Sequence, residues 1–532
     1  MLVVDVIAER LRERGVRFVF GMPGGATVPL MAAMDRVGIK FVLVRHEGSA
    51  GFMADAVFQR TGGLGVCIAT LGPGVTNLVS GVAQAYTERS KVLAIINQCE
   101  DHLVPLYTHQ IIDQEAIFTA ICHGFHRLRA HRPEWHLHKV FQQVDAIDGP
   151  IVLEISAGVS NSECGNMVRS PNPVVATPDV DSIASVLVHS KRPVVMIGAE
   201  DLSRESAASL GVLIDELQIP FLTTYRAKGI VDENHTLSLG AAGLSPVVDE
   251  LQQSILRESD TILLIGFDMV EMRPNWLEGW LEHADVVSMS TVGQVDIPTT
   301  LTVDWRGIIG KGLNALKDQV RRPNWEWTSD KIQLHQRRLK AIFESESSSG
   351  AINPARAIEQ IQKSSPDDTV LCLDVGAHRI TASHVWRCRQ PRSILQSNGF
   401  SSMGVGLPMA ISVKLHEPKT PVVALTGDMG LWMSLGELGV IQERGLHIIV
   451  IYLSDSALSL IELKQERSAT PKKTGVRFDN PDTLSIAKAF CGTGYICETL
   501  EEVEHAVGVA HAQDGLHLIE IQVDPSYYRA QM

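Results

Sequence analysis

Several features that mark special classes of protein are missing from this sequence of 532 residues. No run of apolar residues approaches the ~18 positions that a membrane-spanning helix needs. The start reaches a charged residue at Asp5 and lacks the basic and then apolar regions of a secretory signal peptide. We therefore expect a protein without a membrane partner and with a cytoplasmic location.

Paired cysteines and an excess of positive charge are missing as well. The eight cysteines include no C-x-x-C pair, which argues against a zinc site or a thioredoxin-like redox site, and we expect free thiols. The chain has 47 Lys and Arg residues against 61 Asp and Glu residues, a formal net charge of −14. This charge disfavours nucleic acid as a partner and otherwise indicates ordinary solubility.

The sequence does contain a regular alternation of short apolar runs and helix-like stretches. Apolar residues make up 45% and charged residues 20%, which excludes a disordered or collagen-like chain. The alternation predicts an α/β fold, in which helices cover both faces of parallel sheets. The predicted strands are Arg17–Phe20, Lys40–Val44, Gly65–Thr70, Val92–Asn97, Pro150–Ile155, Pro193–Gly198, Pro220–Thr224, Thr261–Gly266, Asp285–Ser290, Thr369–Asp374, Pro421–Thr426, His447–Leu453 and Leu516–Val523.

Two polar linkers divide these strands into three sets, each with about the length of one doubly wound α/β domain. The first linker runs from Asn161 to about Ser182 and includes Ser170-Pro171-Asn172-Pro173. The second runs from about Asp318 to Gly350, and within it Lys331–Phe343 is predicted to be a charged surface helix. We therefore expect three doubly wound parallel-sheet domains, which comprise residues 1–165, 183–325 and 350–532.

Two aspartates follow neighbouring strands of the third set. Asp428 comes shortly after Pro421–Thr426, and Asp455 follows His447–Leu453. Because adjacent parallel strands end side by side, the two carboxylates could converge and hold a Mg²⁺ ion together with a diphosphate. Either aspartate taken alone is also a typical helix N-cap or turn residue.

The arrangement Gly427-Asp428 followed by Ser454-Asp455 resembles the cofactor motif of the thiamine-diphosphate-dependent enzymes of the acetolactate synthase and pyruvate oxidase type. That motif is Gly-Asp-Gly, followed at this spacing by Asn-Asn. The resemblance implies that Asp428 and Asp455 bind the metal through their side chains and Ala457 through its carbonyl oxygen. Met429 stands where the family has Gly, and Asp455 where it has the second Asn, but Asp still offers a hard oxygen ligand.

Two further segments of the third set are similar to the family. Asp374-Val375-Gly376-Ala377-His378 resembles the loop near the diphosphate, and the segment 398–408 resembles the one beneath the thiazolium ring. The resemblance implies that Met403 is the apolar wedge that bends the cofactor and that the Ser401 carbonyl accepts from its 4′-amino group. The implied cofactor contacts in this set are Gly376, Ala377, His378, Ser401, Met403, Gly427, Met429, Gly430, Ser456, Ala457 and Leu458.

The first set of strands carries a second signal at Arg45-His46-Glu47. A glutamate in a first helical turn is explained by the helix dipole alone. The resemblance implies that Glu47 instead hydrogen-bonds N1′ of the aminopyrimidine, so that the cofactor can lose its C2 proton. It also implies cofactor contacts at Pro23, Gly24, Gly72 and Asn77, and a catalytic role for Gln110, with His109 as a further proton-transfer candidate.

The resemblance covers nearly the whole chain and implies a pyrimidine-binding, a central and a diphosphate-binding domain in that order. In the family, the glutamate and the metal ligands of one active site come from different subunits. A homodimer or a homotetramer with shared active sites is therefore implied.

Two segments depart from the biosynthetic acetolactate synthases. Their Val-Arg-Gln-Trp-Gln corresponds to Ile461-Glu462-Leu463-Lys464-Gln465, where Glu462 and Lys464 become candidate substrate contacts. Their Gly-Ala-Arg-Phe-Asp, in which Arg helps to bind flavin, corresponds to a segment with Asp268 at the Arg position. FAD therefore stays open.

The resemblance implies a thiamine diphosphate- and Mg²⁺-dependent carboligase or lyase that acts on a 2-ketoacid or aldehyde, with pyruvate as the expected donor. Three alternatives belong to the same family: a 2-ketoacid decarboxylase, an aldehyde lyase and a carboxyethylarginine-synthase-like enzyme. A non-catalytic thiamine diphosphate-binding relative is a further alternative, because Met429 and Asp455 depart from the motif.

Overall fold

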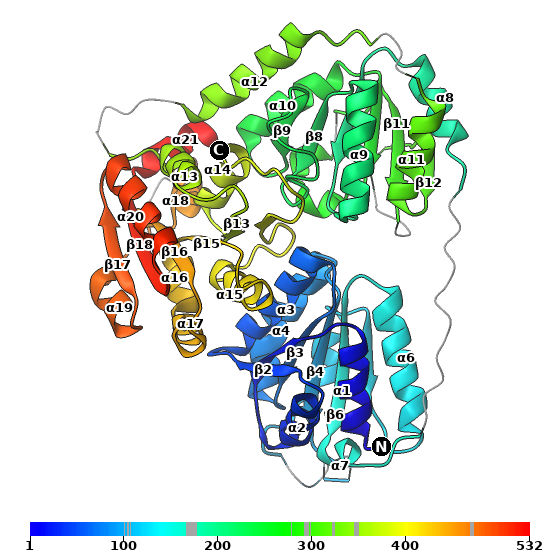
Figure 1. The fold of residues 1–532 in the computed structure, drawn as a ribbon, viewed down its shortest axis with the longest axis vertical. Coiled ribbons are helices and arrows are strands. Elements are labelled where there is room, and N and C mark those ends of the chain that lie inside the picture. Colours follow the sequence, from blue (N-terminus) through cyan, green and yellow to red (C-terminus); the bar gives the residue numbers. More distant parts are fainter. Residues whose placement is uncertain are drawn as a thin grey trace.

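The computed structural model describes residues 1–100, 102–103, 106, 108–165, 178–277, 279–291, 297, 299–321, 325–344, 351–468 and 473–532. Over these residues the chain forms three six-stranded sheets with helices packed against them (Figure 1). Every paired strand runs parallel to its neighbour. The predicted α/β fold with three parallel sheets is confirmed.

The first unit has the strand order β2-β1-β3-β4-β6-β5. Its strands are β1 (Phe18–Met22), β2 (Lys40–Leu43), β3 (Gly65–Ala69), β4 (Val92–Gln98), β5 (Gly124–Arg127) and β6 (Pro150–Ser156). Its helices are α1 (Val3–Glu13), α2 (Val28–Arg36), α3 (Glu47–Thr61), α4 (Pro73–Thr87), α5 (Gln114–Phe118), α6 (Pro133–Ala146) and α7 (Ala157–Ser160).

The central unit has the strand order β12-β11-β10-β7-β8-β9. Its strands are β7 (Pro193–Ile197), β8 (Phe221–Thr224), β9 (Ser238–Ala242), β10 (Thr261–Ile265), β11 (Asp285–Ser290) and β12 (Val303–Arg306). Its helices are α8 (Asp181–His189), α9 (Arg204–Leu217), α10 (Pro246–Arg257) and α11 (Ile309–Gln319). The helix α12 (Ser329–Phe343) then leads to the third unit and matches the predicted surface helix.

The third unit has the strand order β14-β13-β15-β16-β18-β17, which repeats that of the first unit. Its strands are β13 (Val370–Leu373), β14 (Ile394–Leu395), β15 (Val422–Gly427), β16 (Ile448–Ser454), β17 (Thr493–Cys497) and β18 (Leu516–Gln522). Its helices are α13 (Pro354–Lys363), α14 (Ala377–Val385), α15 (Gly406–His416), α16 (Asp428–Ser434), α17 (Leu438–Arg444), α18 (Ser459–Glu466), α19 (Thr483–Ala489), α20 (Leu500–Ala512) and α21 (Tyr528–Gln531).

Five strands were not predicted, and each of them lies at the edge of a sheet. They are β5, β9, β12, β14 and β17. Edge strands are bordered on one side only, and four of these five are short or partly exposed, whereas β9 is buried throughout. β14 has two residues, and no residue of β5 is fully buried. Their sequences therefore lack the continuous apolar run that identifies a central strand.

The first and third units share one hydrophobic core. Helix α3 packs against α15 (Figure 1), and one cluster of buried side chains contains Met53 and Leu78 together with Met409 and Ile411. The central unit has a separate core, with residues such as Leu263. Fully burying an apolar side chain of this size contributes about 1.5–3 kcal/mol, so the shared core holds the first and third units together.

The predicted linker segments 170–173 and 345–350 lie outside the described residues, and the three domain boundaries stay predictions. All eight cysteines are free thiols. Over the described residues, every helix is too short or too polar to cross a membrane.

Candidate active site

The site at the third sheet begins where two adjacent strands end. β15 ends at Gly427 and α16 begins at Asp428, while Asp455 directly follows β16. The strands pair with Gly427 opposite Leu453, so both aspartates reach the same edge of the sheet. Asp428 Oδ2 accepts hydrogen bonds from the Ser456 amide at 2.6 Å and the Asp455 amide at 3.3 Å. The structure thus brings the two predicted metal ligands together.

Two buried polar atoms at this edge have no hydrogen-bond partner. They are Asp428 Oδ1 and Nε2 of His378, which lies in the first turn of α14. Burial raises the pKa of Asp428, and burial with the added charge of Asp428 raises the pKa of Asp455 to about 7. Two neighbouring carboxylates that are costly to ionise fit a cation between them. The described residues hold no group of three acidic, His or Cys side chains that could bind a metal alone, so further oxygens would come from backbone and ligand.

The loop around His378 lies against the same edge. Asp374 is buried and accepts from Thr426 Oγ1 and the Val405 amide, both at 2.9 Å. A Cβ on Gly430 would lie 1.6 Å from Asp374 Oδ2, so only glycine fits there. Gly376 precedes α14, and Ala377 and His378 form its first turn, where free N–H groups favour a phosphate.

Other predicted cofactor contacts lie nearby in the third unit. Met429 is half-buried in the first turn of α16. Ser456 has a φ of +55°, and Ala457 forms an isolated bridge with Arg477. The Leu458 amide donates to Val476 at 2.8 Å. The segment 456–458 is therefore paired with the segment 476–478, a contact that the sequence did not suggest.

Asn480 is a site residue that sequence reasoning missed. Its Nδ2 donates to Asp428 Oδ2 at 3.0 Å and to Ser454 Oγ at 3.1 Å, and its Oδ1 accepts from Trp432 Nε1 at 2.9 Å. It thereby orients one oxygen of Asp428 and leaves Oδ1 open. Asn480 stands before a proline, which by itself signals only a turn.

Glu47 lies in a second cluster, in the first unit. It is the first residue of α3, is 5% exposed, and accepts from Asn77 Nδ2 at 3.0 Å. A Cβ on Gly74 would lie 3.2 Å from Glu47 Oε1. Gly72 has a φ of +68°, and a Cβ there would lie 2.6 Å from the Gln110 carbonyl oxygen. The structure thus brings Glu47, Asn77 and the glycine loop close to Gln110.

The remaining predicted residues of the first unit lie around these loops. Pro23 and Gly24 follow β1, and a Cβ on Gly24 would lie 2.2 Å from Thr70 Oγ1. Gln110 has a positive φ of 62° and is half-buried, while His109 is exposed.

A carboxylate of the third unit holds the start of α3. Glu437 Oε1 accepts from the Arg45 amide at 3.0 Å and the His46 amide at 3.2 Å. Glu437 is buried, and burial raises the pKa of its carboxyl group. The backbone that leads into Glu47 is therefore fixed by the unit that carries the two aspartates.

The two predicted substrate residues differ in their surroundings. Glu462 is buried and binds Arg477 through two hydrogen bonds of 2.9 and 2.8 Å, with Lys473 at 2.9 Å. Lys464 is exposed. Because the Glu462 carboxylate is already neutralised by two cations, it acts on its surroundings mainly by orienting Arg477, which sequence reasoning did not single out.

The chain that carries these two clusters is similar in sequence to known proteins. Residues 1–117 match the family described as "Thiamine pyrophosphate enzyme, N-terminal TPP binding domain", residues 180–311 its central domain, and residues 374–521 its C-terminal TPP binding domain. The chain is 26% identical to an acetolactate synthase large subunit of Haemophilus influenzae, over 98% of this chain and 94% of that one. It is also 26% identical to an acetolactate synthase of Bacillus subtilis, over 98% and 93% of the two chains.

Proposed function

The chain belongs to the thiamine pyrophosphate enzyme family and is a thiamine-diphosphate-dependent enzyme of the transferase or lyase kind, and we propose that it is a magnesium-dependent carboligase or lyase that acts on a 2-ketoacid. Pyruvate is the proposed donor. The observation that carries the proposal is the pair of buried atoms without partners, Asp428 Oδ1 and His378 Nε2, at the edge of the third sheet.

Asp428 and Asp455, with the Ala457 carbonyl, are the proposed Mg²⁺ ligands. The raised pKa values of both carboxyl groups support this role, because a bound cation stabilises the ionised forms that burial penalises. Carboxylate and carbonyl oxygens are the ligands that Mg²⁺ prefers. His378 and the first turn of α14 are the proposed contacts of the diphosphate.

Glu47 is the proposed proton partner of the aminopyrimidine. When bound, thiamine diphosphate supplies a carbon nucleophile and an electron sink. Glu47 is buried and held by Asn77, so its carboxyl group is oriented before any ligand enters. Gln110 and His109 are proposed to handle the substrate, because Gln110 packs against Gly72, two residues from the glycine that contacts Glu47.

The proposal includes a homodimer or homotetramer in which Glu47 of one protomer serves the metal site of its partner. It also includes a cytoplasmic location.

The proposal does not include a bound flavin. The cleft between the first and central units, of about 660 Å³, is lined by six carboxylates and three cationic side chains, a surplus of 6 − 3 = 3 negative charges. Asp268 in that lining is paired with Arg89. This lining does not fit the diphosphate of a flavin dinucleotide.

The test compares the wild type with Glu47→Gln. With pyruvate we expect kcat to fall by about 10²–10⁴-fold, since an acid–base group of this kind contributes that much. Exchange of the C2 proton of bound cofactor slows with it, while Mg²⁺-dependent cofactor binding, measured by calorimetry, stays within about threefold. Glu9→Gln on the surface of α1 is the control and leaves all three unchanged.

C2-proton exchange at the wild-type rate in Glu47→Gln would refute the role of Glu47. Absence of Mg²⁺-dependent cofactor binding in the wild type would refute the metal site. Mass spectrometry of the products from pyruvate, with and without added 2-ketoacids or aldehydes, separates a carboligase from a simple decarboxylase.

A further inference from the structure

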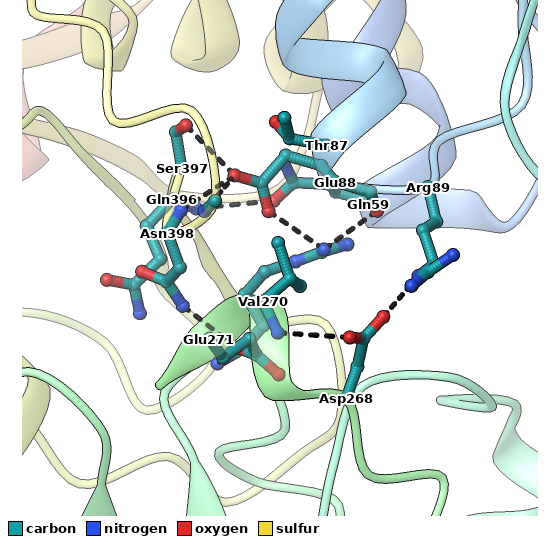
Figure 2. Close-up of polar contacts among 12 residues, drawn as sticks. Gln59, Thr87, Glu88, Arg89, Asp268, Val270, Glu271, Gln396, Ser397 and Asn398 are labelled. Carbon is teal, nitrogen blue, oxygen red and sulfur yellow. Dashed lines mark hydrogen bonds and ion pairs between the residues drawn. The ribbon is translucent and has the colours of Figure 1, made fainter. Parts of the chain in front are cut away.

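Glu88 is a buried carboxylate at which all three units meet (Figure 2). It caps the C-terminus of α4 in the first unit and is 2% exposed. Its Oε1 accepts from the Asn398 amide at 2.7 Å and the Gly399 amide at 2.8 Å. The same atom accepts from Ser397 Oγ at 3.0 Å. One oxygen of the first unit thus binds a whole turn of backbone in the third.

The other oxygen of Glu88 points to the central unit. Glu88 Oε2 accepts from Arg226 Nη1 at 2.9 Å, and this guanidinium is buried as well. The Arg226 amide donates to Glu271 Oε1 at 3.1 Å, and Asn398 Nδ2 donates to the same oxygen at 2.9 Å. Figure 2 shows the Glu88 and Glu271 side chains on two sides of the segment 396–398. Both carboxylate oxygens of Glu88 are therefore needed as acceptors, one on each side.

The turn that Glu88 binds leads directly into the proposed cofactor contacts. Ser397 Oγ, which donates to Glu88, accepts from the Ser401 amide at 3.0 Å. Ser401 has a φ of +55°, a left-handed conformation that persists only when its surroundings enforce it. Arg379 Nη1 donates to the Ser397 carbonyl and, at 3.3 Å, to Ser401 Oγ. A continuous set of hydrogen bonds connects Glu88 to Ser401.

The neighbouring contacts leave this turn little freedom to shift. A Cβ on Gly399 would lie 2.7 Å from Val270 Cγ2 and 3.1 Å from Thr87 Cβ. The first unit makes a second contact with this segment, in which Gln59 Oε1 accepts from the Gln396 amide at 3.2 Å. The position of the segment 396–401 is therefore set by side chains of the first and central units.

We propose that Glu88 is a positioning residue that holds the segment 397–403 in the conformation in which Ser401 and Met403 meet the cofactor. The inference rests on the proposed cofactor site, and it assigns to Glu88 a role that its ion pair with Arg226 does not require. A glutamine at this position has one acceptor and one donor group. Either the backbone amides or Arg226 would then face an N–H group instead of an oxygen.

The experiment compares full-length Glu88→Gln with Glu417→Gln. Glu417 also joins the first and third units, through Arg60 at 2.9 and 2.7 Å, but it accepts from no backbone amide near the cofactor segment. Hydrogen exchange of peptides that cover residues 397–403 is followed by mass spectrometry in the cofactor-free protein. Cofactor affinity with saturating Mg²⁺ is then measured by calorimetry.

We expect amide exchange in the segment 397–403 to accelerate at least tenfold in Glu88→Gln, and the Kd of thiamine diphosphate to rise about 10–100-fold, the usual cost of losing a residue that orients ligand contacts. In Glu417→Gln both quantities stay within about threefold. Equal exchange in wild type and Glu88→Gln would overturn the proposal, and so would equal acceleration in both variants. Because exchange is measured without cofactor, a wild type that fails to bind the cofactor refutes the proposed function and not the contact.

If Glu88→Gln does not fold, the double variant Glu88→Gln/Arg226→Met is tested in its place. Without the guanidinium, the oxygen of the introduced amide is free to face the Asn398 and Gly399 amides. Slow exchange of the segment returns in this variant if Glu88 acts through these amides. Fast exchange in a folded double variant, with a cooperative thermal transition, would overturn the proposal.

Discussion

The first and third units have the same strand order but different polar groups at the carboxyl ends of their strands. In the third unit, Asp428 begins α16 directly after β15, and Asp455 directly follows β16. In the first unit, Gly72 immediately precedes α4 and Gly74 lies in its first turn, and the nearby carboxylate is Glu47 on α3. One topology thus carries the proposed cation site in one copy and a close backbone approach in the other, because the sheet sets where the strands end and the residues after each strand set the chemistry there.

The two units also hold each other in a reciprocal way. Glu88 of the first unit binds the backbone before Ser401, and Glu437 of the third unit binds the backbone before Glu47. Each unit therefore supplies a buried carboxylate that fixes a segment of the other. The central unit contributes Arg226, which donates to Glu88. At the carboxyl end of its strand β10, Asp268 forms an ion pair with Arg89 of the first unit.

The largest expected effect distinguishes the strand ends of the third unit, with Asp428, from those of the first unit, near Glu47. Asp428→Ala removes the proposed ligand with the open oxygen, and we expect Mg²⁺-dependent cofactor affinity to fall at least 100-fold, since a side-chain ligand matters more than the partners that orient it. Asn77→Ala, which removes the partner of Glu47, weakens affinity less than about tenfold. Calorimetry with and without Mg²⁺ checks both. Equal losses of cofactor affinity in Asp428→Ala and Asn77→Ala would show that the strand ends of the first and third units do not differ as proposed.

The second effect concerns pH and the buried carboxyl group of Asp55 on α3. Burial raises its pKa to about 6, and the nearby charge of Glu88 adds to the shift. Between pH 3.8 and 6 the folded state holds a proton that the unfolded state has released, so stability falls as pH rises through this window. We expect Asp55 to contribute a decrease on the order of 2 kcal/mol in the free energy of unfolding between about pH 4 and 7.

Asp55→Asn removes this titration while keeping the shape of the side chain. Urea unfolding at several pH values checks the expectation, with Asp145→Asn at the surface as the control. An unchanged slope of stability against pH in Asp55→Asn would contradict it.

A third effect tests the contact from the third unit to the first. Glu437→Ala leaves the amides of Arg45 and His46 without their acceptor, which costs about 1–3 kcal/mol when the groups stay buried. We expect the C2-proton exchange that depends on Glu47 to slow about tenfold. Glu443→Ala, which removes an exposed partner of the Arg45 and Arg444 side chains and no acceptor of the Arg45 or His46 amides, is the matched control. Exchange at the wild-type rate in Glu437→Ala would separate Glu437 from the function of Glu47.

The smallest effect is expected in the central unit. Asp268→Asn breaks the ion pair with Arg89, whose side chain is 42% exposed, and a pair of this kind contributes about 0–1 kcal/mol. Cofactor affinity and pyruvate turnover should change less than about threefold, because the proposed function assigns no step to this edge. A larger loss of turnover would place the central unit in the active site and break the contrast with the third unit.

The central strands of all three sheets were predicted from sequence because a strand with neighbours on both sides is a continuous apolar run. Five of the six edge strands were missed for the opposite reason, as β12 with its exposed Asp304 and Arg306 illustrates. Asp428, Asp455 and Glu47 could be singled out because they stand in motifs of local sequence. Asn480, Arg477, Glu437 and Glu88 could not, because their partners are 15 or more residues away in the chain.

The sequence by itself determined the α/β class, the parallel sheets and the order of the motifs, since apolar periodicity and glycine placement are local properties of the chain. Tertiary structure alone decided which carboxylates are already satisfied inside the protein and which are left with an open oxygen. Both oxygens of Glu88 and of Glu462 are occupied by backbone, side chains or cations, whereas Asp428 keeps Oδ1 and Glu437 keeps Oε2 without a partner. That difference depends on burial and on partners brought together by folding, because a carboxylate has the same chemistry in the unfolded chain wherever it stands.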